Sequence, residues 1–476
     1  MAAFINACST NCGARIRIKA RVTAKGNVMA GSKFSLPPLK RAGADPEARN
    51  RQLQAVESDI QAGRLSEAAS LLNELAQANP NDARVYLAGW MLASKAGNAA
   101  AALQSAERAT SLAPLSAIAH YCLSEAQQGQ GDVAAARNSI NQALMLAPTN
   151  LRFRELAVNL ANAQADHASA EMHLRAAFAQ NADIPGVKTM IGNALRYQSK
   201  FDEARTWLLE ALAISADDAD ALHGLAMVSY LQDDRVAAQK YLAAALKHRP
   251  TDPGYLYLDA VFKGEAPSQP PEAMTRGLFD RYANRFDTHL VGALKYRVPQ
   301  KISAAILELF PDRKLNILDL GCGTGLLGAA LGPINGFFVG VDLSKSMLEE
   351  ATKHNVYSRL HQVNLLDALE ATDASEYEVI AAADVFVYLG ALDAAITNAF
   401  KVLRPGGWLF FSCESAPDDG PDFVVRKTMR YAQSQKYAKR LLDSAGFAAP
   451  SIETIDLRME QDEAIAGFLV SVQKPA

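Results

Sequence analysis

The stretch Ile317-Leu-Asp-Leu-Gly-Cys-Gly-Thr-Gly325 decides the fold of the C-terminal part of this 476-residue chain. The apolar run that includes Leu315, Leu318 and Leu320 is typical of a buried parallel strand. Three glycines then alternate with small residues, which lets the backbone turn sharply and approach a ligand that a Cβ atom would exclude. Residues 326–331 are mostly apolar and predict a short helix. The stretch therefore predicts a cradle for a polar ligand at the carboxyl ends of the strands in an open α/β sheet.

Length and composition restrict the class of protein. The chain is long enough for several domains, and 49% hydrophobic residues allow large cores. A net charge of −3 without a long basic run in the body of the chain argues against a nucleic-acid partner. Five scattered cysteines favour a reducing compartment and form no metal-ligand set. No uncharged apolar window reaches the length of a membrane span, so we expect no membrane partner, and the oligomeric state stays open.

Residues 1–44 contain basic residues and no acidic residue. This bias resembles an organelle-targeting peptide. The alternatives are a disordered leader or a chain that truly starts at Met29. We favour a disordered leader, because the alanine- and leucine-rich remainder is typical of a bacterial protein. The expected location is therefore the cytoplasm, and organelle import is the alternative.

A 34-residue period runs from about residue 49 to residue 251. Pro80, Pro114 and Pro148 are 34 residues apart, and Pro250 follows three periods later. Twelve residues before each repeat point stands an alanine: Ala68, Ala102, Ala136, Ala170, Ala204 and Ala238. Seven residues after these stand Leu75, Ala109, Ala143, Ala177, Ala211 and Ala245, and glycines at 63, 97 and 131 mark the first three turns between helices. Small residues at fixed positions let paired helices approach closely, and proline ends the second helix of a pair.

This spacing resembles tetratricopeptide (TPR) repeats, with residues 45–263 forming helical repeats and a C-terminal cap at Tyr255–Phe262. The resemblance implies an all-α superhelix whose concave surface binds a protein or peptide. Alternatively, the array only dimerises or solubilises its neighbour. Most large aromatics of the repeat pattern are replaced, Trp90 being an exception. Three prolines in residues 264–273 predict a linker, and the second domain is expected at residues 274–476.

The spacing of the glycines restricts the class of ligand that the loop can bind. Gly321, Gly323 and Gly325 form GxGxG, and Leu326 stands where a dinucleotide-binding fingerprint has its third glycine. Asp342 ends the next predicted strand, where a carboxylate can accept both hydroxyls of a ribose. These residues alone fit NAD or an adenosyl ligand.

A second motif separates these ligands. The string Val402-Leu-Arg-Pro-Gly-Gly-Trp-Leu-Phe-Phe-Ser412 resembles the entry to the fifth strand of class I S-adenosylmethionine-dependent methyltransferases. The resemblance implies a Rossmann-like α/β domain with a seven-stranded, mostly parallel sheet and an antiparallel final strand near residues 468–472. It also implies S-adenosylmethionine as cofactor and no metal.

The resemblance implies roles for individual residues. Asp319 and the backbone at Gly321, Gly323 and Gly325 would face the methionine portion, and Asp342 would hold the ribose. The implied adenine contacts are Leu343, Met347, Leu366 and Asp367, with a helix cap as the alternative for Asp367. Tyr282 and Phe279 share one helical face and would cover the cofactor as a lid, or simply pack on the sheet.

The acceptor side is less defined. The predicted fourth strand, about residues 377–383, lacks the Asn-Pro-Pro-Tyr type of motif that follows it in enzymes that methylate amide or exocyclic nitrogens. Asp384 and Tyr388 are the candidate catalytic residues, with a loop cap and a packed aromatic as alternatives. His289 is expected to be structural.

The sequence thus favours an S-adenosylmethionine-dependent methyltransferase with a TPR protein-interaction module and an unknown acceptor, either a small molecule or a protein side chain. One alternative is a TPR adaptor whose methyltransferase domain binds cofactor without turnover. A nucleotide-dependent oxidoreductase is disfavoured by Leu326.

Overall fold

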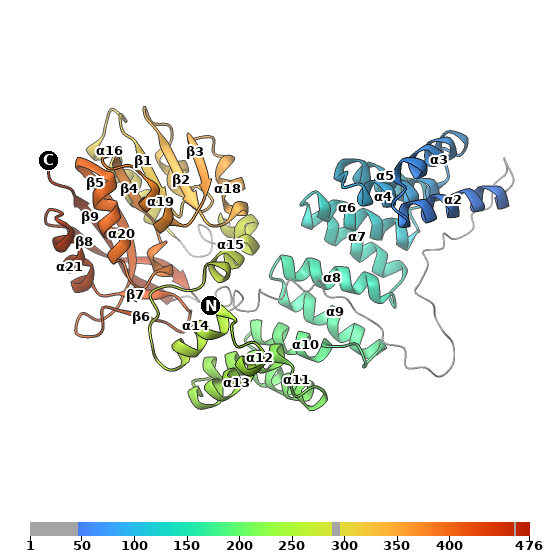
Figure 1. Ribbon diagram of the computed structural model, residues 1–476, viewed down its shortest axis with the longest axis horizontal. Coiled ribbons are helices and arrows are strands. Elements are labelled where there is room, and N and C mark those ends of the chain that lie inside the picture. The colour runs from blue at the N-terminus through green and yellow to red at the C-terminus, as the bar shows by residue number, and fades with distance from the viewer. Residues whose placement is uncertain (1–45, 288–295, 461–462) are drawn as a thin grey trace. The chain divides into compact units, whose positions relative to one another are not determined.

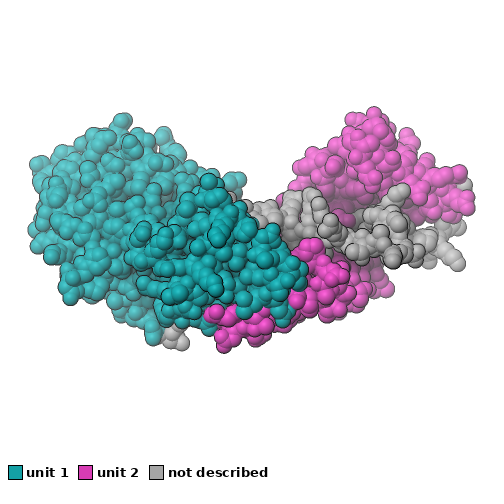
Figure 2. Space-filling view, turned by 60° about the horizontal axis from the view of Figure 1, so that its bottom comes forward, with its two compact units in different colours: residues 1–13, 208–476 teal, residues 14–207 magenta. Residues whose placement is uncertain are grey.

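The computed structural model describes residues 46–287, 296–460 and 463–476 (Figure 1). The predicted leader at residues 1–44 and His289 lie outside these residues. The chain divides into two compact units between Trp207 and Leu208, inside helix α11 (Phe201–Ile214) (Figure 2). Each unit is described by itself.

The repeat region consists of helices in antiparallel pairs, six pairs in residues 46–248. They are α2 (Pro46–Gln61), α3 (Leu65–Ala78), α4 (Ala83–Lys95), α5 (Ala99–Leu112), α6 (Ala117–Gly129), α7 (Val133–Leu146), α8 (Leu151–Ala163), α9 (His167–Gln180), α10 (Val187–Tyr197), α11, α12 (Ala219–Leu231) and α13 (Arg235–His248). The six alanines predicted at the closest packing points, from Ala68 to Ala238, are at most 3% exposed. The predicted repeat architecture is confirmed, because small residues lie where helices meet.

The turn between the two helices of each pair contains a residue with a positive φ. Gly63, Gly97 and Gly131 have φ values of 78°, 73° and 82°. The equivalent positions of the next three pairs are not glycine, yet they keep a positive φ: Ala165 (51°), Ser199 (60°) and Asp233 (65°). The left-handed turn is therefore imposed by the helix packing, and glycine is only its least strained occupant.

Helix α14 (Pro253–Phe262) follows the last pair at the predicted position of the cap. The Phe262 ring stacks on Tyr230 of α12 with centroids 4.5 Å apart, and Tyr255 stacks on His223 at 5.1 Å. Aromatic stacking thus covers the apolar face of the last pair.

The C-terminal domain contains one mixed sheet with nine strands in the described residues. They are β1 (Ile317–Leu320), β2 (Phe338–Asp342), β3 (Arg359–Gln362), β4 (Tyr377–Ala382), β5 (Leu403–Ser415), β6 (Phe423–Val425), β7 (Tyr431–Gln433), β8 (Ser451–Glu460) and β9 (Glu463–Gln473). Strands β3, β2, β1, β4 and β5 are adjacent in this order and parallel. Strand β9 pairs antiparallel with β5 and β8, as predicted for the final strand. The predicted seven strands are present, and the short hairpin β6–β7 is added at the carboxyl end of β5.

Helices cover both faces of the sheet (Figure 1). One apolar cluster contains α16 (Val298–Leu309) and α17 (Leu326–Leu331), and the other contains α19 (Leu365–Ala371), α20 (Asp393–Val402) and α21 (Gln435–Ala445). Phe410 belongs to the first cluster and Phe411 to the second, and both are 0% exposed. Neighbouring residues of a strand point to opposite faces of the sheet. Burying each of these phenylalanine side chains stabilises the folded domain by about 2 to 3 kcal/mol. Polar groups that face a ligand therefore lie at the strand ends.

Candidate cofactor site

The glycine loop follows β1 and leads into α17. Gly321 has a φ of 63°, and a Cβ atom added there would lie 2.4 Å from Cγ2 of Val385, in the loop after β4. Gly325 has a φ of 85° and precedes the first residue of α17. Both positions favour glycine because both have a left-handed φ, and Gly321 in addition has no space for a Cβ atom.

Asp342 ends β2 and contacts the glycine loop. Its Oδ2 accepts a hydrogen bond from the Gly323 amide at 3.0 Å, and its Oδ1 accepts one from the Ser344 amide at 2.8 Å. Burial raises the pKa of Asp342 to about 6. Ser344 in turn caps α18 (Lys345–Thr352) by accepting from the Met347 amide. Strand end, glycine loop and helix start therefore hold one carboxylate in place.

A cavity of about 230 Å³ lies at this edge of the sheet. Five segments line it: the end of β1, the end of β2, the residues after β3, the loop after β4, and the segment before and within α15 (Glu272–Asp287). The lining residues are Gly321, Val341, Asp342, Leu343, Val363, Asn364, Leu365, Asp367, Val385, Tyr388, Leu389, Gln269, Pro270, Glu272, Thr275 and Phe279. Parallel strands direct their carboxyl ends to the same edge, so the cavity stands where α/β folds bind ligands.

Six of the predicted site residues line this cavity, namely Gly321, Asp342, Leu343, Asp367, Tyr388 and the predicted lid residue Phe279. Of the others, Gly323 reaches it only through its hydrogen bond to Asp342. The Tyr282 backbone lies in α15, and its side chain is outside the described residues.

Asp319, Met347 and Leu366 are not among the lining residues. Asp319 is 1% exposed and accepts a hydrogen bond from the Tyr357 hydroxyl at 2.8 Å. Burial raises the pKa of Asp319 to about 7, against the opposing effect of this hydrogen bond. Met347 is 0% exposed, and Leu366 packs on the apolar cluster while its neighbour Leu365 lines the cavity.

Sequence reasoning did not assign Asn364, Thr275 or Gln269 to the site. The Asn364 side chain caps α19 by accepting from the Leu366 amide at 2.9 Å, the kind of role that had been the alternative for Asp367. Thr275 is 7% exposed although it follows a proline-rich linker. Asn364 belongs to the same short segment as the predicted contacts Leu366 and Asp367, whereas no local pattern marks Thr275 or Gln269, which tertiary packing brings to the cavity.

Asp384 lies just after β4 in a left-handed conformation with a φ of 55°. Its amide donates to Ser412 Oγ at 2.8 Å, and its two carboxylate oxygens accept from Arg458 Nη1 at 3.1 and 2.9 Å. Arg458 has a side chain only 1% exposed and also pairs with Glu414 and Glu460. Asp384 is therefore part of a buried ion network and does not line the cavity.

Tyr388 forms the wall beside this network. Its ring makes an edge-to-face contact with Phe279, with centroids 5.0 Å apart. Burial raises the pKa of Tyr388, opposed by the nearby Arg430 guanidinium. The hydroxyl therefore stays protonated at neutral pH.

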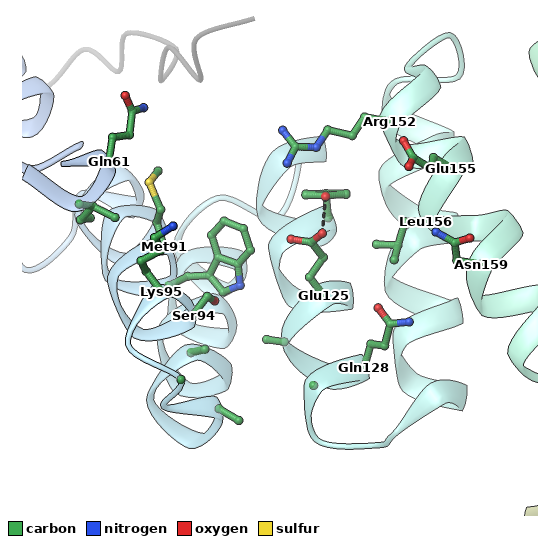
Figure 3. Close-up of a pocket in the computed structure, with 18 residues that line it drawn as sticks. Gln61, Met91, Ser94, Lys95, Glu125, Gln128, Arg152, Glu155, Leu156 and Asn159 are labelled. Carbon is green, nitrogen blue, oxygen red and sulfur yellow. Dashed lines mark hydrogen bonds between the residues drawn. The ribbon is translucent and has the colours of Figure 1, made fainter. Parts of the chain in front are cut away.

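The repeat unit contains a separate groove of about 1070 Å³, lined mainly by α4, α6 and α8. Glu125 and Gln128 lie in the middle of the groove (Figure 3). The polar side chains and one methionine on its two sides are Gln61, Met91 and Lys95 on one, and Arg152, Glu155 and Asn159 on the other. Tyr121 donates its hydroxyl hydrogen to Glu125. The Trp90 indole Nε1 is buried in this lining and has no hydrogen-bond partner in the described part of the chain.

Two kinds of feature are absent from the described residues, a membrane-spanning helix and a metal-ligand cluster. In that part of the chain, no helix has the length and apolarity that crossing a membrane requires. The same residues contain no group of three or more His, Cys, Asp or Glu side chains arranged to hold a metal ion.

Comparisons with known proteins agree with both architectures. Residues 318–409 match the family described as "Methyltransferase domain", and residues 192–233 match the family described as "TPR repeat". A ubiquinone biosynthesis O-methyltransferase of Paraburkholderia phytofirmans is 33% identical over 100 residues, which are 20% of this chain and 43% of the relative. The chain thus spans less than half the length of this curated relative.

Solved structures resemble each region in turn. Pseudomonas aeruginosa PilF is similar to 45% of this chain and 98% of its own, with 18% identity and a TM-score of 0.37. A SAM-dependent methyltransferase of Thermotoga maritima is similar to 42% of this chain and 99% of its own, with 16% identity and a TM-score of 0.31. From the two family matches and the topology of the sheet, the chain is a fusion of TPR repeats with a class I methyltransferase domain.

Proposed function

We propose that the C-terminal domain binds S-adenosylmethionine and transfers its methyl group to an acceptor that the repeats help to recruit. The observation that carries this proposal is the meeting of Gly321 and Asp342 in one cavity at the carboxyl ends of β1 and β2. A glycine without a Cβ admits the methionine portion, and a carboxylate can accept the hydroxyl hydrogens of the ribose.

The bound cofactor supplies an activated sulfonium methyl group, so the protein mainly positions the two reactants. Orientation alone can contribute about 7 to 11 kcal/mol to lowering the barrier. Leu343 is proposed to contact the adenine from one side, and Asp367 and Asn364 are proposed to bind its polar edge. Asp319, Met347 and Leu366 then support the site from below without touching the ligand.

For the acceptor side we propose two different roles. Asp384 is absent from the cavity lining and is held by the buried Arg458 guanidinium, so we assign Asp384 as a positioning residue that fixes the loop after β4. Tyr388 is protonated and lines the cavity, so it is proposed to donate a hydrogen bond to the acceptor. An acceptor that ionises readily needs no further base from the protein.

The groove in the repeat unit is the proposed site for a protein partner. Its polar sides can bind the backbone of an extended peptide, and the buried Trp90 N–H gains a free-energy benefit from a carbonyl or carboxylate partner. A cytoplasmic location belongs to the same proposal, because Cys122, Cys322 and Cys413 are buried free thiols.

Ligand-dependent unfolding tests the cofactor. S-adenosylhomocysteine at one hundred times its dissociation constant should stabilise the domain by about 2.7 kcal/mol, whereas NAD should not. Asp342→Ala should abolish the shift, and Asp456→Ala, which removes a carboxylate from β8 outside the cavity lining, should preserve it. Stabilisation by NAD in place of the homocysteine ligand would contradict the proposal.

A silent adaptor is the second candidate, and the observation that favours it is the engagement of Asp384 by Arg458. Incubating the full chain with methyl-labelled cofactor and cell lysate separates the two. Transfer of label to a small molecule or a protein supports the enzyme, provided that Asp342→Ala loses it. Binding of the homocysteine ligand without any labelled product supports the adaptor.

A further inference from the structure

The segment that leaves the repeats forms one wall of the cofactor cavity. Pro270, Thr275 and Phe279 line the cavity together with Gln269 and Glu272. Pro270 and Thr275 are buried, which is unusual for a connecting segment. Gln269, Pro270 and Glu272 of the predicted linker at residues 264–273 therefore line the cavity.

Three contacts fix this wall to the transferase sheet. The Ser268 carbonyl accepts from the amides of Gly390 and Ala391 at 2.8 and 3.2 Å, just after the loop that follows β4. The Phe279 ring meets Tyr388 of the same loop. Asp280 accepts a hydrogen bond from Ser344 Oγ at 2.7 Å, next to Asp342. The segment thus spans the cavity from the end of β4 to the end of β2.

The same segment continues from helix α14, which belongs to the compact unit of the transferase. The hydroxyls of Tyr257 on α14 and Tyr431 on β7 lie 3.2 Å apart, and both side chains are at most 5% exposed. In the repeat pair before α14, Asp233 forms an ion pair with Lys427 at 2.5 Å. The final helices of the array are therefore docked on the hairpin β6–β7.

The hairpin reaches the cavity as well. Gln433 of β7 donates from Nε2 to the carbonyls of Leu389 and Phe386 at 2.6 and 3.3 Å. Leu389 lines the cavity. Helix α14 is thus connected to the cavity twice, through the covalent segment 263–279 and through β7.

We propose that helix α14 couples the repeat array to the cofactor site, so that its docking on β7 sets the affinity of the transferase for its cofactor. This inference rests on the proposed function. Because coupling between two equilibria is reciprocal, cofactor binding must also tighten the docking of α14. A partner that shifts the last repeats would then change cofactor occupancy without touching the cavity.

Hydrogen exchange on the unmodified full chain tests the reciprocal effect. S-adenosylhomocysteine should slow amide exchange at least threefold in α14 and in residues 268–280, besides the cavity strands. Helix α4, in the other compact unit, should exchange at its original rate. Slowing at residues 338–343 with no change in α14 would overturn the coupling and leave the proposed function intact. No slowing anywhere would instead count against the proposed function.

Two variants with matched controls measure the effect on affinity. Phe279→Ala should weaken binding of the homocysteine ligand about tenfold, and Phe337→Ala, which removes a phenylalanine that is 56% exposed, should not. Tyr257→Ala should weaken binding severalfold, whereas Tyr86→Ala in the other unit should not. Circular dichroism reports whether Tyr257→Ala folds. If the folded variant binds as tightly as the unmodified chain, α14 does not set the affinity.

Discussion

At the residue scale, Ala165 has a strained backbone conformation. Its φ of 51° is left-handed, and the first three repeats have glycine at the equivalent position. A left-handed alanine costs roughly 1 kcal/mol relative to glycine. Ala165→Gly should therefore raise the free energy of unfolding of the repeats by roughly 1 kcal/mol, measured by urea denaturation. Ala177→Gly is the matched control and should lower it, because Ala177 is a buried residue inside α9.

Asp342 gives the proposed cofactor site a defined pH dependence. Its pKa is raised by burial to about 6, and only the ionised carboxylate is a charged acceptor for ribose hydroxyls. Affinity for S-adenosylhomocysteine should therefore fall as the pH drops from 8 to 5, measured by calorimetry. Asp342→Asn should bind weakly with a flatter profile. An unchanged slope in that variant would assign the titration to another group.

Asp319 and Asp342 also make the free energy of unfolding depend on pH. This dependence has the opposite sign to that of the cofactor affinity. The folded pKa values of Asp319 and Asp342, about 7 and about 6, exceed their ordinary value of 3.8. The folded domain therefore holds more protons than the unfolded chain between about pH 4 and 7. The contribution of these two groups to the free energy of unfolding should fall as the pH rises through this window. Asp319→Asn should reduce the fall, as followed by denaturation at each pH.

At the scale of elements, β8 brings a buried arginine to the ends of β4 and β5. Arg458 forms ion pairs with Asp384, Glu414 and Glu460, and Arg430 adds a second positive charge beside Glu460. Removing one member of a buried ion network typically costs about 3 to 5 kcal/mol. Arg458→Met should destabilise the domain by that amount in chemical denaturation. Arg440→Met, which removes an exposed, solvent-screened pairing with Asp422, should have a much smaller effect.

The stabilisation that this ion network provides decreases at low pH. Although burial opposes it, Arg430 and Arg458 lower the pKa of Glu460 to about 2, from an ordinary value of 4.5. Its stabilising contribution is complete above about pH 4.5 and is lost as the pH falls towards 2. The Glu460→Gln variant should lack this part of the acid sensitivity.

Elements with strong local patterns were predictable from sequence, and elements formed by tertiary contacts were not. The apolar runs at β1, β2 and β4 stand at the predicted positions, because buried parallel strands need continuous apolar residues. The hairpin β6–β7 was missed, since each strand has only three residues, and β7 is held by pairing with the distant strand β5 while β6 pairs with β7. Arg458 of β8 was not singled out from the sequence. The three carboxylates around it come from separate strand ends that no local pattern connects.

At the scale of the whole molecule, two compact units predict two unfolding transitions. The transition of the transferase unit should shift upwards with S-adenosylhomocysteine, since only that unit contains the proposed cofactor cavity. The other transition should not move. Differential scanning calorimetry of the full chain with and without the ligand measures both. A single transition that shifts as a whole would show that the units unfold together.

The position of the boundary inside α11 has a consequence for protein engineering. A chimera that joins a foreign repeat array at the proline-rich segment 264–273 would discard α12 to α14, and with them the contacts of Tyr257 and Asp233. A junction before Leu208 would keep these helices with the transferase. In this chain the exchangeable module is therefore shorter than its repeats, because the last repeats have become part of the catalytic unit's architecture.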